Sequence, residues 1–397
     1  MRDRSTRRHR LSLKSQLSSR ASTDLHTYLD HNATTPVRPE AAEAVARALA
    51  QYGNASSVHR FGRLIRHVVD GAREDVAALV DTAPANIIFT SGGTEANNQA
   101  LMGHDGPVLV SAVEHDSVRE VRADATIIPV DANGITCGET LDRLLWDAGG
   151  GSLVSVMLAN NETGVLQPIR EIFAVARAHG AVVHCDAVQA AGKMAIAFDD
   201  LGADVLSLSA HKFGGPPGIG ALVVRDGFDP ELLLRGGGQE RRRRAGTENV
   251  PGIAGFGAAA CAAKAGIAKF GRLGALRDNM EARLRDAVSD IVIHGGDAPR
   301  LPNTSCLGLP GLASEIQVMQ LDLAGIAVSA GSACSSGKVA SSHVLRAMGC
   351  ENETARSAIR VSLGWSTEPR DVVRFIDAWI AMAQRRDGKA EKRRSVA

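Results

Sequence analysis

Along the first two thirds of the chain, short apolar runs alternate with stretches in which apolar residues recur every three or four positions. The helical spacing is clearest over residues 168–180, and it predicts an amphipathic helix there. The apolar runs predict strands at 86–90, 106–111, 152–158, 181–185, 205–209 and 220–224. Apolar strands separated by amphipathic helices predict an α/β fold in which βαβ units surround a mostly parallel, buried sheet.

After about residue 265 the pattern changes to a second, α+β type. It predicts a charged helix at 270–290, strands at 291–294 and 305–309, a helix at 314–323, a Gly/Ser/Ala-rich loop at 329–338 and a final helix at 368–384. The chain is therefore expected to have four parts. These are a basic tail at 1–26, a large domain at 27–265 whose first residues pack with the small domain, a small domain at 266–384 and a basic tail at 385–397.

Composition narrows the possible classes. A length of 397 residues suits two domains, and 44% apolar with 22% charged residues excludes a chain that is disordered throughout. The longest uncharged run, at 250–263, is shorter than the roughly 20 residues of a membrane-spanning helix, so we expect no membrane partner. The net charge of +1 combines two basic ends with an acidic body, and only 4% of residues are aromatic, so we expect no nucleic-acid partner.

The first 23 residues hold seven Lys and Arg and one acid, without the apolar core of a secretory signal. Three interpretations stay open: a solvated tail, an organellar address, or a start codon placed too early. The six cysteines form no Cys-x-x-Cys pair, so we expect no disulfide framework, no metal site of the protein's own and a reducing, cytoplasmic compartment. Each cysteine, Cys261 in its apolar run included, is expected to be a small buried side chain unless its surroundings indicate otherwise.

Candidate chemistry lies where predicted strands end, because ligands of such sheets bind beyond the carboxyl ends of the strands. Residues 91–95, Ser-Gly-Gly-Thr-Glu, join a strand to a helix expected to start near Ala96, which favours either a phosphate site or a plain capped turn. Asp186 follows the strand 181–185, with Gln189 three residues later. Lys212 follows the strand 205–209 and precedes a run of glycine and proline.

A phosphate cradle, an acid and a lysine at one sheet edge are the groups that pyridoxal phosphate requires. The lysine forms an imine with its aldehyde, and the acid keeps the ring nitrogen protonated so that the ring can accept electrons. Cys334 lies in a loop of small residues, where an exposed thiol can act as a nucleophile.

The chain then resembles a known family through motifs that occur in order from about residue 28 to residue 384. They stand at 28–36 (Tyr-Leu-Asp-His-Asn-Ala-Thr-Thr-Pro), 90–97 (Thr-Ser-Gly-Gly-Thr-Glu-Ala-Asn), 112–115 (Ala-Val-Glu-His), 160–164 (Asn-Asn-Glu-Thr-Gly), 186–189 (Asp-Ala-Val-Gln), 209–212 (Ser-Ala-His-Lys), 236–240 (Gly-Gly-Gly-Gln-Glu), 245–249 (Ala-Gly-Thr-Glu-Asn) and 331–334 (Gly-Ser-Ala-Cys). With these motifs the chain resembles cysteine desulfurases of the NifS/IscS type, which belong to the class V aminotransferases. That resemblance implies a fold-type I transferase with a seven-stranded, mostly parallel sheet and a smaller α+β C-terminal domain.

The resemblance also implies a role for each matching residue. Catalysis would rest on Lys212, which binds the cofactor as an imine and moves the Cα proton, on the Cys334 nucleophile, and on His115, which stacks on the ring and is a candidate proton shuttle. Cofactor binding would involve Gly93, Thr94, Ser209 and His211 at the phosphate, Asp186 and Gln189 at the ring, and Asn161 beside it. Thr247 would complete the phosphate site of a partner subunit in a homodimer. Asn32, Asn161 and Arg360 would bind the substrate, with Arg360 on its carboxylate.

The implied activity is removal of sulfur from L-cysteine, which leaves L-alanine and a persulfide on Cys334. Selenocysteine lyase or aminotransferase activity on the same scaffold is the alternative, and a non-catalytic subunit would be expected to lack Lys212 or Asp186. The sulfur would pass to an acceptor or iron–sulfur scaffold protein, whose cluster Cys334 would share transiently. The acceptor, and the choice among general, nitrogenase and tRNA-thiolation pathways, stay open.

Three positions depart from the family pattern. Ala340-Ser341 stands where relatives usually have Glu-Pro, Arg242 where they have a small residue, and Trp365 where a basic residue is common.

Overall fold

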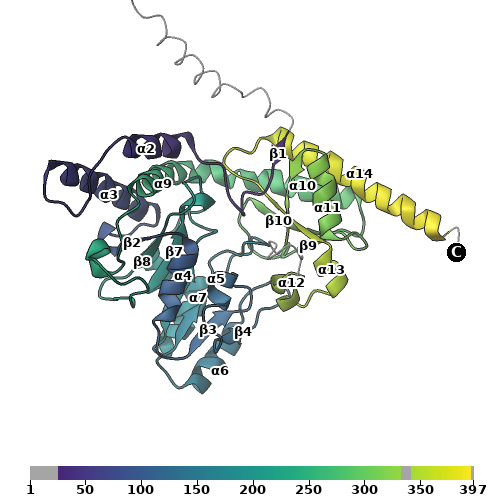
Figure 1. The fold of residues 1–397 in the computed structure, drawn as a ribbon. Helices are drawn as coiled ribbons and strands as arrows, with labels where there is room; N and C mark the ends of the chain where they lie inside the picture. The colour runs from purple at the N-terminus through teal and green to yellow at the C-terminus, as the bar shows by residue number, and fades with distance from the viewer. Residues whose placement is uncertain (1–25, 332–340, 395–397) are drawn as a thin grey trace, which may run out of the picture.

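A seven-stranded sheet forms the centre of the computed structural model, which describes residues 26–331 and 341–394 (Figure 1). Its strands, in spatial order, are β2 (Ile87–Thr90), β8 (Gly220–Val224), β7 (Val205–Ser209), β6 (Val182–Asp186), β5 (Leu153–Ser155), β3 (Val108–Ser111) and β4 (Thr126–Ile128). Only β8 runs antiparallel to its neighbours, and the other pairs are parallel. The predicted mostly parallel sheet is confirmed.

Both faces of this sheet are buried, which is why its strands are apolar without alternation. In β3, Val108 and Val110 pack in one core with Leu101, whereas Leu109 packs in the other with Phe173. The helices that cover the sheet and flank it in the chain are α2 (Pro39–Leu49), α3 (Arg60–Leu79), α4 (Gly93–Met102), α5 (Asp116–Arg119), α6 (Gly138–Ala148), α7 (Ile169–Ala178), α8 (Phe198–Leu201) and α9 (Val250–Gly271).

The C-terminal part builds a second core on a four-stranded antiparallel sheet. Its spatial order is β12 (Ser329–Ala330), β13 (Ala358–Ser362), β10 (Thr304–Gly308) and β9 (Val292–His294). It carries the helices α10 (Leu273–Ala287), α11 (Ser314–Leu323), α12 (His343–Ala347), α13 (Asn352–Arg356) and α14 (Pro369–Arg394). The N-terminal strand β1 (Thr27–Tyr28) joins this part, because it pairs in parallel with β11 (Ile326–Ala327).

Helix α9 links the two parts and contains the expected domain boundary at residue 265. By length and composition this helix could cross a membrane, so the expectation that no segment reaches that length is wrong. The helix packs instead through small residues, since a Cβ atom on Gly255 would lie 2.6 Å from Val45 of α2 and one on Gly257 would lie 2.7 Å from Ala72 of α3. Its apolar character is therefore explained by close packing against α2 and α3, which lie beside it in Figure 1.

Several predicted elements differ from the observed ones. The charged helix expected at 270–290 is the shorter α10, and the first residues of the expected loop at 329–338 pair as β12. The helix expected near Ala96 already begins at Gly93, and strands β4 and β13 had no prediction. Cys261, expected to be buried, is exposed on α9, while Cys334 lies outside the described residues.

The segment that precedes α9 is held by a buried ion pair. Glu240 accepts two hydrogen bonds from Arg73, at 2.7 and 2.8 Å, and a third from the Phe89 amide of β2 at 3.0 Å. Glu240 and the next two residues all have positive φ angles of 48–66°, a conformation that favours glycine. Arg242, where the resemblance predicts a small residue, is one of them. The contacts of Glu240 thus stabilise a left-handed backbone conformation at residues 240–242, which residues other than glycine disfavour.

Replacement of Glu240 by alanine should lower the free energy of unfolding by about 3–5 kcal/mol, because it leaves a buried guanidinium and a strand amide without their acceptor. Urea unfolding measures this loss. Glu43→Ala is the control, since Glu43 forms only an exposed pair with Arg47, and its loss should stay below about 1 kcal/mol. Equal losses in the two variants would contradict the assignment of Glu240 as the anchor of this segment.

Candidate active site

A cavity of about 320 Å³ lies at the carboxyl ends of the parallel strands. Eleven of the thirteen predicted site residues line it: Asn32, Gly93, Thr94, His115, Asn161, Asp186, Gln189, Ser209, His211, Lys212 and Arg360. Thr247 is exposed and is not among the described residues that line the cavity, and Cys334 lies outside the described ranges. Within the described ranges, one chain therefore brings together all the predicted groups except Thr247.

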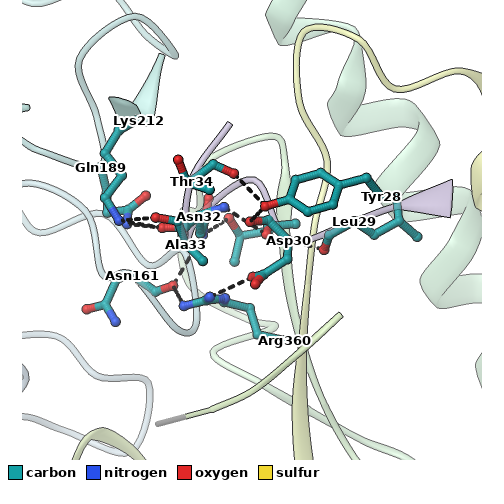
Figure 2. Close-up of polar contacts among 12 residues, drawn as sticks. Tyr28, Leu29, Asp30, Asn32, Ala33, Thr34, Asn161, Gln189, Lys212 and Arg360 are labelled. Atoms are coloured by element: carbon teal, nitrogen blue, oxygen red, sulfur yellow. Dashed lines mark hydrogen bonds and ion pairs between the residues drawn. The ribbon is translucent and has the colours of Figure 1, made fainter. Parts of the chain in front are cut away.

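Lys212 follows β7 on a short 3-10 turn, Ala210–Lys212, that directs its amine into the cavity. The Nζ atom donates hydrogen bonds to the main-chain oxygens of Asn32, at 2.7 Å, and Ala33, at 2.9 Å (Figure 2). Burial, and after it the charge of Arg360, lowers the Lys212 pKa to about 8, although Asp186 opposes the shift. The amine is therefore neutral often enough near neutral pH to act as a nucleophile or base.

One end of the cavity is suited to an anion. Helix α4 begins there at Gly93, so its first amides face the cavity with their partial positive charge. A Cβ atom on Gly93 would lie 2.9 Å from Val188 and 3.3 Å from Ser209, so only glycine leaves the approach open. Burial, followed by the charge of Lys212, lowers the His211 pKa to about 4, which leaves this imidazole neutral beside the hydroxyl groups of Thr94 and Ser209.

Asp186 lies at the end of β6, on the wall of the same cavity. Its two carboxylate oxygens accept hydrogen bonds from Asn97 Nδ2, at 2.8 Å, and from the Val188 amide, at 2.9 Å. Beneath it, burial and then the charge of Asp186 raise the pKa of Glu114 well above its usual range, so Glu114 is a neutral acid. Of these two carboxyl groups, Asp186 is the one that lines the cavity.

His115 lies at the cavity mouth, where it caps the short helix α5. Its Nδ1 atom accepts a hydrogen bond from the Ser117 amide at 3.0 Å. Because that contact occupies one ring nitrogen, Nε2 is the nitrogen left to face a bound molecule.

These groups fit pyridoxal phosphate. The α4 amides with Thr94, Ser209 and His211 suit its phosphate, and Asp186 suits a protonated ring nitrogen. Lys212 supplies the amine that its aldehyde needs, and Gln189 stands between the acid and the lysine. The donor set therefore matches the cofactor group by group.

The expected carboxylate site differs from the sequence prediction in one respect. Arg360, on β13, already forms an ion pair with Asp30 at 2.8 Å and donates a hydrogen bond to the main-chain oxygen of Asn161 at 3.1 Å (Figure 2). Its Nε atom is buried and has no hydrogen-bond partner among the described residues. A substrate carboxylate would therefore share Arg360 with Asp30 or displace it.

Two residues of this site were missed in the sequence. Asp30 stands within the motif at 28–36, so the motif was a usable signal, but its partner Arg360 is 330 residues away. Lys193 is buried behind the cavity, and no signal indicated it, because lysine is normally a surface residue.

Comparisons with known proteins agree with this geometry. The model of the class-V aminotransferase family matches residues 27–375. The cysteine desulfurase IscS of Dictyoglomus turgidum is 40% identical over 366 residues, which cover 88% of this chain and 92% of the relative. The X-ray structure of a NifS-like protein from Rickettsia africae has a TM-score of 0.84 at 35% identity and covers 89% of this chain and 98% of its own. A structure of SspA in complex with cysteine has a TM-score of 0.72 at 29% identity and covers 85% and 98%.

In the cofactor-free protein, the rate at which an amine reagent modifies Lys212 should rise with pH around a midpoint near 8. The midpoint should fall in Asp186→Asn, because that carboxylate raises the Lys212 pKa, and should rise in Arg360→Gln, because the guanidinium lowers it. Mass spectrometry of the Lys212 peptide across a pH series measures both shifts. Shifts in the same direction would contradict the electrostatic description of the site.

Proposed function

This chain belongs to the class-V aminotransferase family, and we propose that it is a cysteine desulfurase that uses pyridoxal phosphate to take sulfur from L-cysteine and release L-alanine. The observation that carries the proposal is one cavity in which the Lys212 amine, the Asp186 carboxylate and the Arg360 guanidinium all face the same space. Relatives named cysteine desulfurase, and a structural neighbour solved with cysteine, support the choice of substrate.

In this proposal each residue that lines the cavity has a role set by its position. Pyridoxal phosphate, when bound, supplies a ring that delocalises the electrons left at Cα. Lys212 holds the cofactor and moves the proton at the substrate Cα, a task suited to an amine with a pKa of about 8. Arg360 orients the substrate carboxylate in exchange for Asp30, and His115 covers the mouth of the cavity.

The sulfur step is assigned to Cys334 on its sequence motif. The Cys334 thiolate attacks the substrate sulfur, and a new S–S bond forms while the Cβ–S bond breaks. The electron pair of that bond goes to Cβ, which takes up a proton and becomes the methyl group of alanine. Cys334 is left with a persulfide, whose outer sulfur can pass to a thiol of an acceptor or iron–sulfur scaffold protein.

We also propose that the protein is a homodimer in which Thr247 of each subunit completes the phosphate site of the other. In support, an apolar surface patch made of Leu49, Tyr52, Val58, Phe61 and Leu64 is exposed on α2, α3 and the loop between them. That loop lies beside the Thr247 segment, because Ser56 and Glu248 line one surface cavity. Burial of this apolar patch would favour association of two copies.

We also propose a reducing, cytoplasmic compartment, because the cysteines form no Cys-x-x-Cys pair. The five cysteines within the described ranges are free thiols, and reducing surroundings would keep the Cys334 thiol from forming a disulfide between turnovers.

The protein loaded with pyridoxal phosphate should release alanine from L-cysteine, and Cys334→Ala should bind the cofactor normally yet lose sulfur delivery by about a hundredfold or more. Alanine and acceptor-bound sulfur are quantified in the same reaction. Cys261→Ala, which removes another exposed thiol, is the matched control and should leave both unchanged. Unimpaired delivery by Cys334→Ala would exclude it as the sulfur carrier and would favour a lyase.

Shared active sites predict complementation between two inactive variants. Lys212→Ala and Thr247→Ala should each be nearly inactive alone. After they are mixed and allowed to exchange subunits, half the dimers should be mixed and each should contain one intact site, which restores about a quarter of wild-type activity. No recovery, with subunit exchange shown by mass spectrometry, would place Thr247 outside the partner's site.

A further inference from the structure

A second lysine, Lys193, is buried directly behind the cavity. It belongs to a tight turn after β6, and its residue surface is 4% exposed. Gly192 in this turn has φ of 73°, and a Cβ atom there would lie 2.7 Å from Phe213, so the turn is pressed against the core. Lys193 and Lys212 line opposite parts of one small cavity on the far side of the site.

The amine of Lys193 contacts two residues of the cofactor cavity. Its Nζ atom donates hydrogen bonds to Gln189 Oε1 and to Asn32 Oδ1, each at 2.8 Å. Because the amine donates in both contacts, the amide oxygens of Gln189 and Asn32 face it and their NH₂ groups point away from it.

The two NH₂ groups then have fixed directions. Gln189 Nε2 faces the site and donates to the main-chain oxygen of Asn32 at 2.9 Å, the same oxygen that accepts from Lys212. Asn32 Nδ2 faces the small domain and donates to Thr304 Oγ1 at 2.9 Å. The Lys193 amine is thus the donor that orients Gln189 Oε1, whereas Asn32 Oδ1 also accepts a hydrogen bond from Asn303 Nδ2 at 3.1 Å.

The charges around Lys193 are mostly positive. Burial, and then the charges of Lys212 and Arg360, lowers the Lys193 pKa well below its usual range. The pKa of the neighbouring His31 is lowered to about 3, by burial first and by Lys193 next, and His211 is also neutral in this environment. A hydrocarbon side chain would avoid this electrostatic cost, which indicates that the amine has a specific task.

We propose that Lys193 is a positioning residue that locks the Gln189 amide with its NH₂ group toward the ring oxygen of the bound cofactor. The proposal rests on the proposed function, because it assumes the same cofactor in this cavity. Lys193 would not touch the cofactor and would act only through Gln189 and, on the other side, Asn32.

The test measures the dissociation constant of pyridoxal phosphate for the cofactor-free protein, together with the pH midpoint of the absorbance change of the loaded protein. Lys193→Met, which keeps most of the side-chain length but removes the donor, should weaken binding about tenfold and move the midpoint, since one buried hydrogen bond is worth about 1.4 kcal/mol. Lys193→Gln, which keeps an N–H donor, should recover most of the affinity. Lys264→Met removes an exposed lysine of α9 and should change neither quantity.

A double-mutant cycle separates positioning from a general loss of structure. In a Gln189→Ala background, Lys193→Met should add less than about a twofold loss, because the amide through which it acts is gone. An equal tenfold loss in both backgrounds, or an unchanged dissociation constant in Lys193→Met, would overturn the proposal. Alanine release by the wild-type protein is scored separately: if the protein binds the cofactor but releases no alanine, the proposed function fails while the role of Lys193 is still decided by binding.

Discussion

The structure depends on the burial of an amine that must be able to lose its proton. Lys212 lies between the two parts of the molecule, and its Nζ atom is held by the main-chain oxygens of Asn32 and Ala33. Carbonyl oxygens stabilise the amine by hydrogen bonds without the full negative charge that would keep it protonated. Burial beside Arg360 then shifts the balance toward the neutral form.

The segment that supplies those oxygens also joins the two parts. Asn32 receives hydrogen bonds from Gln189 and Lys212 of the large sheet and donates one to Thr304 of β10. The main-chain N–H of Asn32 donates to Ser362 Oγ on β13, two residues after Arg360. A shift of the small domain would therefore displace the main-chain oxygens that hold the amine of Lys212. Strand β1 adds to this link, because it pairs with β11 of the small domain.

Charge within the cavity is divided so that each ionised group has a counterpart or an acceptor. Burial, followed by the charge of Asp186, raises the pKa of Glu114 well above its usual range, which favours the neutral form of that acid. Arg360 is balanced by Asp30, and the buried amines of Lys193 and Lys212 are surrounded by amide and carbonyl oxygens. Asp186 and Arg360 both line the cavity, and under the proposed function they would face a cationic ring and an anionic carboxylate.

The sequence by itself determined the class of sheet and the identity of the chemical groups. Six apolar runs without alternation indicated a sheet buried on both faces, and the polar residues after them, Asp186 and Lys212 among them, had to meet at one edge, since parallel strands end together. Only the tertiary structure decided the contacts between distant segments. Asp30 pairs with Arg360 across 330 positions, and Lys193, which looks like a surface lysine in its local sequence, is buried because the turn at Gly192 folds against Phe213. Local patterns record which face of an element is apolar, whereas the partner of a buried charge depends on how the elements pack.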